Sequence, residues 1–97
     1  MKYAVAVHHD EGTAYGVSVP DLPGCFSAGD SLDEALENVI EAIEFHLEGL
    51  AEEGMEIPRA EPIDAHLDNP DYVDGTWGFV DIDLTPYLGK TEKINVT

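Results

Sequence analysis

The fold of this chain is decided by residues 15–58, which read YGVSVPDLPGCFSAGDSLDEALENVIEAIEFHLEGLAEEGMEIP. The alternating pattern at 16–19 predicts a β-strand, and the Pro-flanked residues 20–24 predict a sharp turn that returns Leu22 to the core. Residues 25–28 can form a short third strand. The stretch therefore predicts a strand, a turn and a second strand, followed by a helix.

A capping box predicts where this helix begins, because Ser31 and Glu34 have the spacing that satisfies free amide groups at a helix start. Apolar residues then recur at intervals of three and four, which places them on one side of a helix. They are Leu32, Leu36, Val39, Ile40, Ile43, Leu47 and Leu50. Gly54 is the expected end, and Pro58 prevents the helix from resuming. We expect this helix to cover the sheet.

Two further strands are predicted outside this stretch. Residues 2–8 place apolar side chains on one face and are expected to pair antiparallel with 16–19 through a tight turn. Residues 77–84 alternate apolar side chains with aspartates and predict a strand at or near the sheet edge. A short helix is predicted within 63–72. The chain is thus expected to be an α+β domain with an antiparallel β-meander, one long helix and a fourth strand (βββαβ).

Composition limits what this domain can do. The 97 residues allow one core, and 21 acidic residues against 4 Lys and Arg give a net charge of −17. Such a negative charge argues against binding to the phosphate backbone of a nucleic acid. It predicts that the partner of this domain is basic. The single Cys25 cannot form an internal disulfide, and neither a signal-peptide layout nor a membrane-spanning apolar run is evident. We expect a cytoplasmic protein with no membrane association.

Three groups of residues invite a chemical interpretation, and each has a plainer structural one. His8 and His9 are neighbours on a strand, so they point to opposite faces and do not converge on one ion. Asp81 and Asp83 suit Mg²⁺, but the first strand offers no further carboxylate, which favours a solvated edge strand. Cys25 fits a small buried residue better than a nucleophile. We therefore expect no metal, no cofactor and no enzyme, with a Mg²⁺-dependent nuclease remnant as the alternative.

The outer face of the predicted helix is acidic, with no Lys or Arg between its glutamates. They are Glu37, Glu41, Glu44 and Glu48. Like charges four residues apart destabilise a helix by roughly 0.2–0.5 kcal/mol per pair, and an ordinary solvated face mixes the two signs. Phe45 is predicted to lie among these acids. A solvated face and a binding face for a basic partner both fit this pattern.

Several motifs in the chain resemble the HicB antitoxins of bacterial and archaeal type II toxin–antitoxin pairs. The motifs are VPDLPGCFSAGDSLDEALENVIEAIEFHLEGLAEEG at 19–54, GTWGFVDIDL at 75–84 and GKTEKINVT at 89–97. The resemblance covers essentially the whole chain. It implies that residues 1–89 form a partial RNase H-like domain without the nuclease's catalytic acids.

The resemblance also implies a partner and a function. The domain would bind a small basic HicA-type toxin, an mRNA-cleaving ribonuclease, and occlude its active-site surface. The residues predicted to bind the toxin are Asp21, Glu37, Glu41, Glu44, Phe45 and Glu48. A non-catalytic structural oligomer with no toxin is a further alternative.

Residues 90–97, KTEKINVT, look like the opening strand of a ribbon-helix-helix DNA-binding domain. The family resemblance implies that such a domain represses the protein's own operon. Lys93, Asn95 and Thr97 would then face the operator DNA. We interpret 90–97 as the start of a truncated C-terminal domain. A ribbon-helix-helix requires two intertwined chains, so a homo-oligomer, a dimer or a tetramer, is expected.

Overall fold

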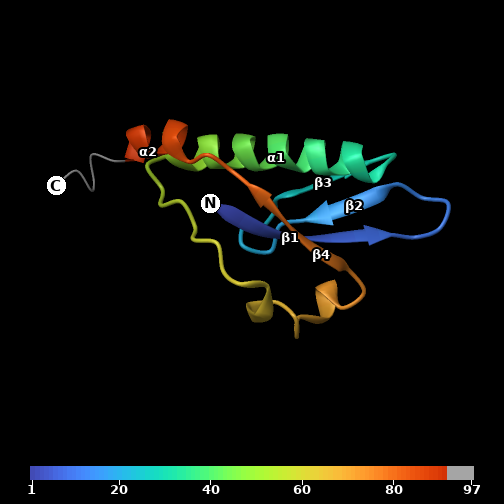
Figure 1. The fold of residues 1–97 in the computed structure, drawn as a ribbon. Coiled ribbons are helices and arrows are strands. Elements are labelled where there is room, and N and C mark those ends of the chain that lie inside the picture. Colours follow the sequence, from blue (N-terminus) through green and yellow to red (C-terminus); the bar gives the residue numbers. More distant parts are fainter. Residues whose placement is uncertain (92–97) are drawn as a thin grey trace.

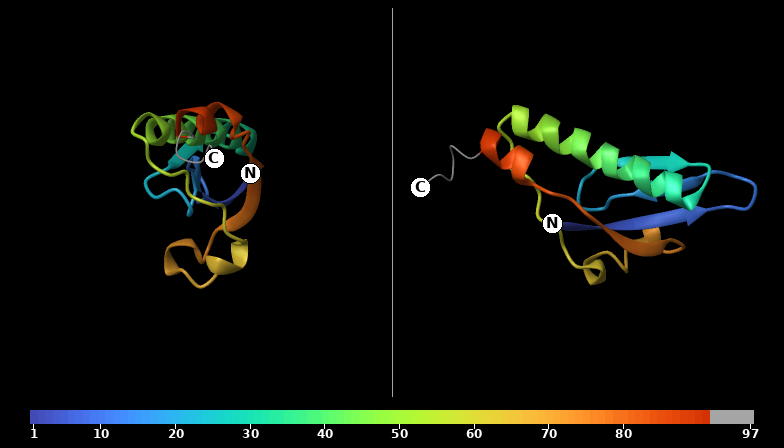
Figure 2. Two further views of the ribbon diagram at one scale, coloured as in Figure 1. Left: turned by 90° about the vertical axis from the view of Figure 1, so that its left-hand side faces the viewer. Right: turned by 45° about the horizontal axis from the view of Figure 1, so that its top comes forward.

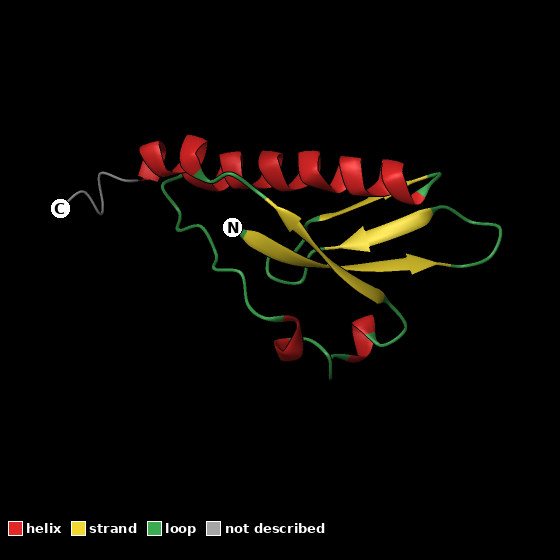
Figure 3. Ribbon diagram, viewed as in Figure 1, coloured by secondary structure: helices red, strands yellow, loops and turns green. Residues whose placement is uncertain are grey.

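Four antiparallel strands form one sheet, and a long helix lies across one of its faces (Figures 1 and 3). The computed structural model describes residues 1–91. The strands are β1 (Lys2–His9), β2 (Tyr15–Ser18), β3 (Phe26–Gly29) and β4 (Thr76–Asp81). The helices are α1 (Leu32–Glu52) and α2 (Thr85–Thr91), with 3-10 turns η1 (Ile63–Ala65) and η2 (Pro70–Tyr72). The predicted α+β class and the βββαβ order are confirmed, and α2 is an element that was not predicted.

The sheet has the order β3-β2-β1-β4, so β4 is an edge strand as predicted. β1 pairs with β2 through Val7 and Val17, and with β4 through Lys2 and Asp81. β4 ends at Asp81, three residues before the predicted end. The prediction that Asp83 belongs to this strand is therefore wrong: Asp83 lies beyond its end and accepts a hydrogen bond (2.9 Å) from the amide of Thr85, the first residue of α2.

The turn at 20–24 brings Leu22 into the core, where its side chain is fully buried. The Leu22 amide donates to the Val19 carbonyl (3.0 Å), and the Cys25 amide donates to the Leu22 carbonyl (2.9 Å). Gly24 has a φ of +86°, a conformation that glycine adopts without a steric penalty. The turn therefore has the sharp return that its two prolines and one glycine predict.

Both ends of α1 are capped as the sequence predicts. At the start, the Ser31 hydroxyl accepts a hydrogen bond from the Glu34 amide (3.1 Å). At the end, Gly54 has a φ of +72°, and the Met55 amide reaches back to the Leu50 carbonyl (2.9 Å). This pair of features is a Schellman motif. The limits of α1 are thus set locally.

The buried stripe of α1 differs in part from the predicted one. Val39, Ile43 and Leu47 are fully buried, but Leu32 is 43% exposed. The cause is a close approach at Gly29, where an added Cβ would lie 2.5 Å from the Ala35 nitrogen. α1 therefore contacts β3 through Ala35 and leaves Leu32 at the rim.

The second face of the sheet is covered by the segment 53–75 (Figure 2). Trp77 on β4 packs here between two rings, stacked on His66 (6.1 Å between centroids) and edge-on to Tyr72 (5.8 Å). The short helix predicted within 63–72 is replaced by the two 3-10 turns, because Pro70 starts η2 under an Asn69 cap. Within residues 1–91, neither helix combines the length and hydrophobicity that crossing a membrane requires.

Candidate functional site

The outer side of α1 carries the predicted acidic surface. Glu37, Glu41, Glu44 and Glu48 are all exposed, and we call them the acidic face. Phe45 lies beside them with 80% of its surface exposed. The structure therefore brings five of the six predicted toxin-binding residues onto one side of the molecule.

An apolar groove of about 460 Å³ runs beside Phe45, between α1 and the β3 edge. Its lining residues are Gly24, Cys25, Phe26, Ala42, Phe45, His46, Gly49, Leu50 and Glu53. Phe26 is 70% exposed, so the groove has a second solvent-facing aromatic residue. Sequence reasoning missed this groove because only the folded chain brings the 24–26 segment next to α1. Small residues at 42 and 49 are the local signal for it.

α2 packs beside the C-terminal part of α1 (Figure 2). Its Tyr87 is buried, and burial raises the pKa of its hydroxyl, with further contributions from Glu44, Glu48 and Asp83. Glu44 and Glu48, the C-terminal half of the acidic face, therefore lie between α2 and the apolar groove.

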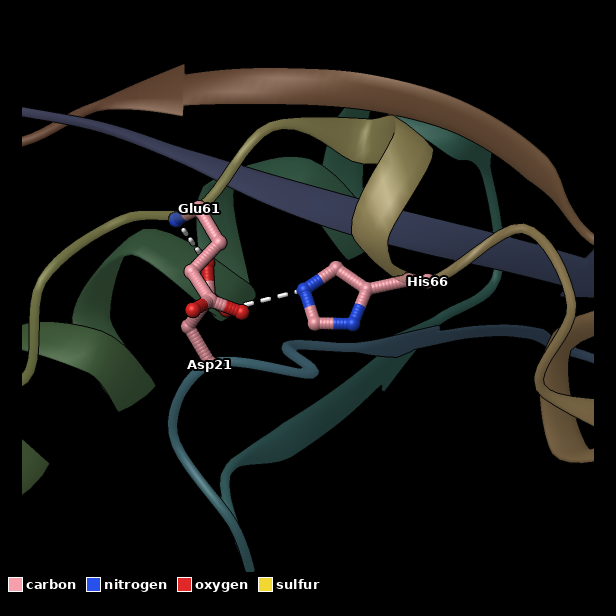
Figure 4. Close-up of side chains that lie close together, drawn as sticks. All are labelled: Asp21, Glu61 and His66. Carbon is pink, nitrogen blue, oxygen red and sulfur yellow. Dashed lines mark hydrogen bonds and ion pairs between the residues drawn. The ribbon is translucent and has the colours of Figure 1, made fainter.

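Asp21, the sixth predicted residue, lies away from this surface. Its side chain is only 3% exposed and points toward the loop before β4 (Figure 4). The carboxylate accepts a hydrogen bond from the Glu61 amide (2.9 Å) and lies 2.8 Å from the Nε2 atom of His66. Its partners follow 40 and 45 residues later, so no local pattern could indicate them.

The same carboxylate acts on Tyr3, whose hydroxyl donates to the Pro58 carbonyl (2.8 Å). Burial raises the pKa of Tyr3 to about 12, and the charge of Asp21 adds to this effect. A neutral tyrosine hydroxyl is thereby retained as a donor. Asp21 and Tyr3 both attach the 58–66 segment to the sheet.

Among residues 1–91, the two aspartates of the nuclease alternative do not form an ion site with a third ligand. Asp81 is exposed and lies 3.4 Å from the amino terminus, while Asp83 accepts a hydrogen bond from the amide of Thr85, the first residue of α2. The hydrogen bonds from Thr85 lower the pKa of Asp83. In the described part of the chain, the one group of three His, Cys, Asp or Glu side chains close enough to share an ion lies elsewhere.

The remaining candidates have structural roles. His8 packs near Gly75, while His9 stacks on Tyr15 with 3.8 Å between ring centroids, so the two imidazoles do not converge. Cys25 is buried, and burial raises the pKa of its thiol, which suits the predicted apolar role.

The predicted DNA-facing residues Lys93, Asn95 and Thr97 lie outside the described residues. α2 extends to Thr91 and so crosses the predicted domain boundary at 89/90.

Comparison with known proteins agrees with this architecture. Residues 3–97 match the family model described as HicB_like antitoxin of bacterial toxin-antitoxin system. An uncharacterized 14.9 kDa protein of Haemophilus phage HP1 is 54% identical over 83 residues, which cover 86% of this chain and 62% of that protein. The chain therefore spans less than two thirds of this relative.

Solved structures show the same fold. The crystal structure of the Burkholderia pseudomallei antitoxin HicB superposes with a TM-score of 0.80 at 39% identity, over all of this chain and 74% of that one. A chain of the HicA3 and HicB3 toxin–antitoxin complex gives 0.71 at 30% identity, over 86% of this chain and 99% of that one. The chain belongs to the family of HicB-like antitoxins of bacterial toxin–antitoxin systems.

Proposed function

We propose that this chain neutralises a small, basic HicA-type toxin by covering its RNA-cleaving surface with the acidic face and the adjoining groove. The observation that carries the proposal is the exposed row of glutamates beside Phe45. Like charges at this spacing repel one another and destabilise a helix. The glutamates therefore lower the stability of α1 without contributing to its packing. A basic partner would remove that repulsion.

Charge supports this partner. With 21 acidic residues and 4 Lys and Arg, the chain presents a surface that attracts a protein built to bind RNA. Complementary potentials speed diffusional encounter and suppress wrong partners. In addition, the HicB3 chain to which this fold is similar forms a complex with the HicA3 toxin.

The apolar groove supplies the second part of such an interface. Strong interfaces combine a desolvated apolar centre with a polar or charged rim, and aromatic residues often carry most of the binding energy. Phe45 stands at the meeting point of the groove and the acidic face. We therefore assign Phe45 as the apolar anchor and the glutamates as the rim.

Charge reversal on the acidic face tests the proposal. Glu41, Glu44 and Glu48 are changed together to Lys, and binding to a HicA-type toxin is measured by calorimetry at low salt. We expect an affinity loss of roughly tenfold to hundredfold, since each exposed pair contributes up to about 1 kcal/mol. The matched control reverses three exposed acids elsewhere, Asp64, Asp68 and Asp71. Equal affinity of the two triple variants would exclude the acidic face as the interface.

Repression of its own operon by the full-length protein, with the C-terminal domain that residues 90–97 begin, is the second part of the proposed function. Lys93, Asn95 and Thr97 alternate as the groove-facing residues of a DNA-binding ribbon would, and such a ribbon requires a homo-oligomer. We also expect the pair to act in the cytoplasm, where a toxin that cleaves mRNA would meet its substrate. A gel-shift assay of the full-length protein with the promoter DNA tests the repression, and binding unaffected by alanine at these three positions would contradict it.

A further inference from the structure

Asp21, Glu61 and His66 converge beneath the sheet from two separate segments (Figure 4). Asp21 comes from the turn between β2 and β3, and the other two come from the loop between α1 and β4. One potential ligand atom from each residue lies within 4.8 Å of the other two. This spacing allows all three to contact a single ion.

The side chains of Asp21 and His66 are largely buried while Glu61 is exposed, and the charge of the cluster favours a cation. The Asp21 side chain is 3% exposed and that of His66 is 13% exposed, yet no Lys or Arg pairs with Asp21 among residues 1–91. A buried carboxylate is costly unless it is paired or binds a metal. The Glu61 carboxylate adds a second negative charge beside it. A divalent cation would compensate both.

We propose that Asp21, Glu61 and His66 form a binding site for Zn²⁺. One imidazole nitrogen and two carboxylate oxygens are suitable zinc ligands, and water can complete a tetrahedron. The imidazole selects against Ca²⁺ and Mg²⁺, which prefer oxygen ligands only. The bound Zn²⁺ would replace the proton between His66 and Asp21. It would also link the turn between β2 and β3 to the loop between α1 and β4.

The surroundings orient these ligands as a metal site requires. The Glu61 amide holds the second oxygen of Asp21 at 2.9 Å, which leaves the first oxygen directed at His66. The His66 ring is stacked on Trp77 with an interplanar angle of 14°. Such supporting contacts fix ligand geometry before the ion arrives.

Glu61 distinguishes a zinc site from a simple hydrogen-bonded clamp. In a clamp, Glu61 contributes only its backbone amide, whereas in a zinc site its carboxylate is a ligand. Glu61→Gln keeps the amide and the Asp21–His66 contact but removes the charged ligand. Asp64→Asn is the matched control, since Asp64 is an exposed acid on the same loop.

The test uses the untagged chain, freed of metal by a chelator and titrated with ZnCl₂ in calorimetry, with melting curves in parallel. We expect one zinc ion per chain and, at saturating zinc, a melting temperature raised by roughly 5 °C. Glu61→Gln and His66→Gln should each weaken binding more than about tenfold, while Asp64→Asn should match the original chain.

Absence of zinc binding by the original chain, or equal zinc affinity in the Glu61→Gln variant, would overturn the proposal. So would loss of binding on replacing His8 and His9 instead. Because His66→Gln removes a packed ring, the Glu61→Gln result decides the matter if that variant fails to fold. None of these outcomes depends on toxin binding.

Discussion

The carboxylate of Asp21 lies 2.8 Å from the imidazole of His66, although 45 residues separate them in the chain. This contact joins the turn after β2 to the loop that covers the second face of the sheet. The loop has no long helix or strand of its own, so its position depends on a few specific contacts. The contacts of Asp21 and the hydrogen bond of Tyr3 are two of these.

Replacing Asp21 by Ala should destabilise the fold by about 1–3 kcal/mol, because it removes the acceptor of the Glu61 amide and the partner of His66 at a buried position. Urea unfolding in the presence of a chelator measures this effect without any contribution from metal. The control variant is Asp64→Asn. Because Asp64 is exposed, this change should alter the free energy of unfolding by less than roughly 0.5 kcal/mol. Similar values for the two variants would contradict a role for Asp21 in holding the loop.

Glycine to alanine changes at 29 and 49 should have opposite signs. A Cβ at Gly29 would meet the backbone of α1 at 2.5 Å, which predicts a loss of about 1–3 kcal/mol. A Cβ at Gly49 meets nothing within 4 Å and lies inside α1, which predicts a gain approaching 1 kcal/mol. Thermal unfolding of both variants checks this, and a stable Gly29→Ala protein would mean that α1 does not approach β3 so closely.

The variant Phe45→Ala should lower the affinity for the toxin without lowering the stability of the fold. Since Phe45 is 80% exposed, its loss should change the unfolding free energy by less than about 0.5 kcal/mol. Toxin affinity should fall by roughly tenfold or more if Phe45 is the anchor of the interface. Val73→Ala removes an exposed apolar side chain away from the groove and should leave affinity unchanged. Equal toxin affinities for the two variants would exclude Phe45 as the anchor.

Stability should decline at high pH because of Tyr3. Its pKa is raised from 10.0 to about 12, so the folded chain keeps the proton in a range where the unfolded chain loses it. The stabilisation is fully present below pH 10 and is lost as the pH rises from 10 toward 12. Urea unfolding across this range measures the decline.

Tyr3→Phe should flatten that decline while costing about 1 kcal/mol near neutral pH, since it removes the hydrogen bond to the Pro58 carbonyl. Identical pH profiles for Tyr3→Phe and the original chain would show that Tyr3 is not the titrating group.

The long helix and the strands could be predicted, because the sequence patterns that specify them span only a few neighbouring residues. Ser31 and Gly54 mark the ends of α1, and alternation marks β1, β2 and β4. The failures occurred where a neighbouring segment decides the outcome. Leu32 matches the apolar period but stays at the rim, because the position of α1 is set by its contact with Gly29.

The candidate surface divides in the same way. The exposed glutamates and Phe45 follow from helical spacing alone, since a side chain opposite a core stripe faces solvent. The groove beside them needs β3 to lie along α1. Asp21 was predicted to bind the toxin, but its side chain is held by a loop that folds back from 40 residues away.

The sequence by itself therefore determined the fold class, the limits of α1 and the acidic face, because caps, periodicity and charge act within a few residues. Only the tertiary structure decided that Asp21, Glu61 and His66 meet and that a groove borders Phe45. These arrangements depend on contacts between segments far apart in the chain. Such contacts leave no periodic pattern in the sequence. They are stabilised by the burial of side chains and by hydrogen bonds between distant segments, and both exist only after the chain has folded.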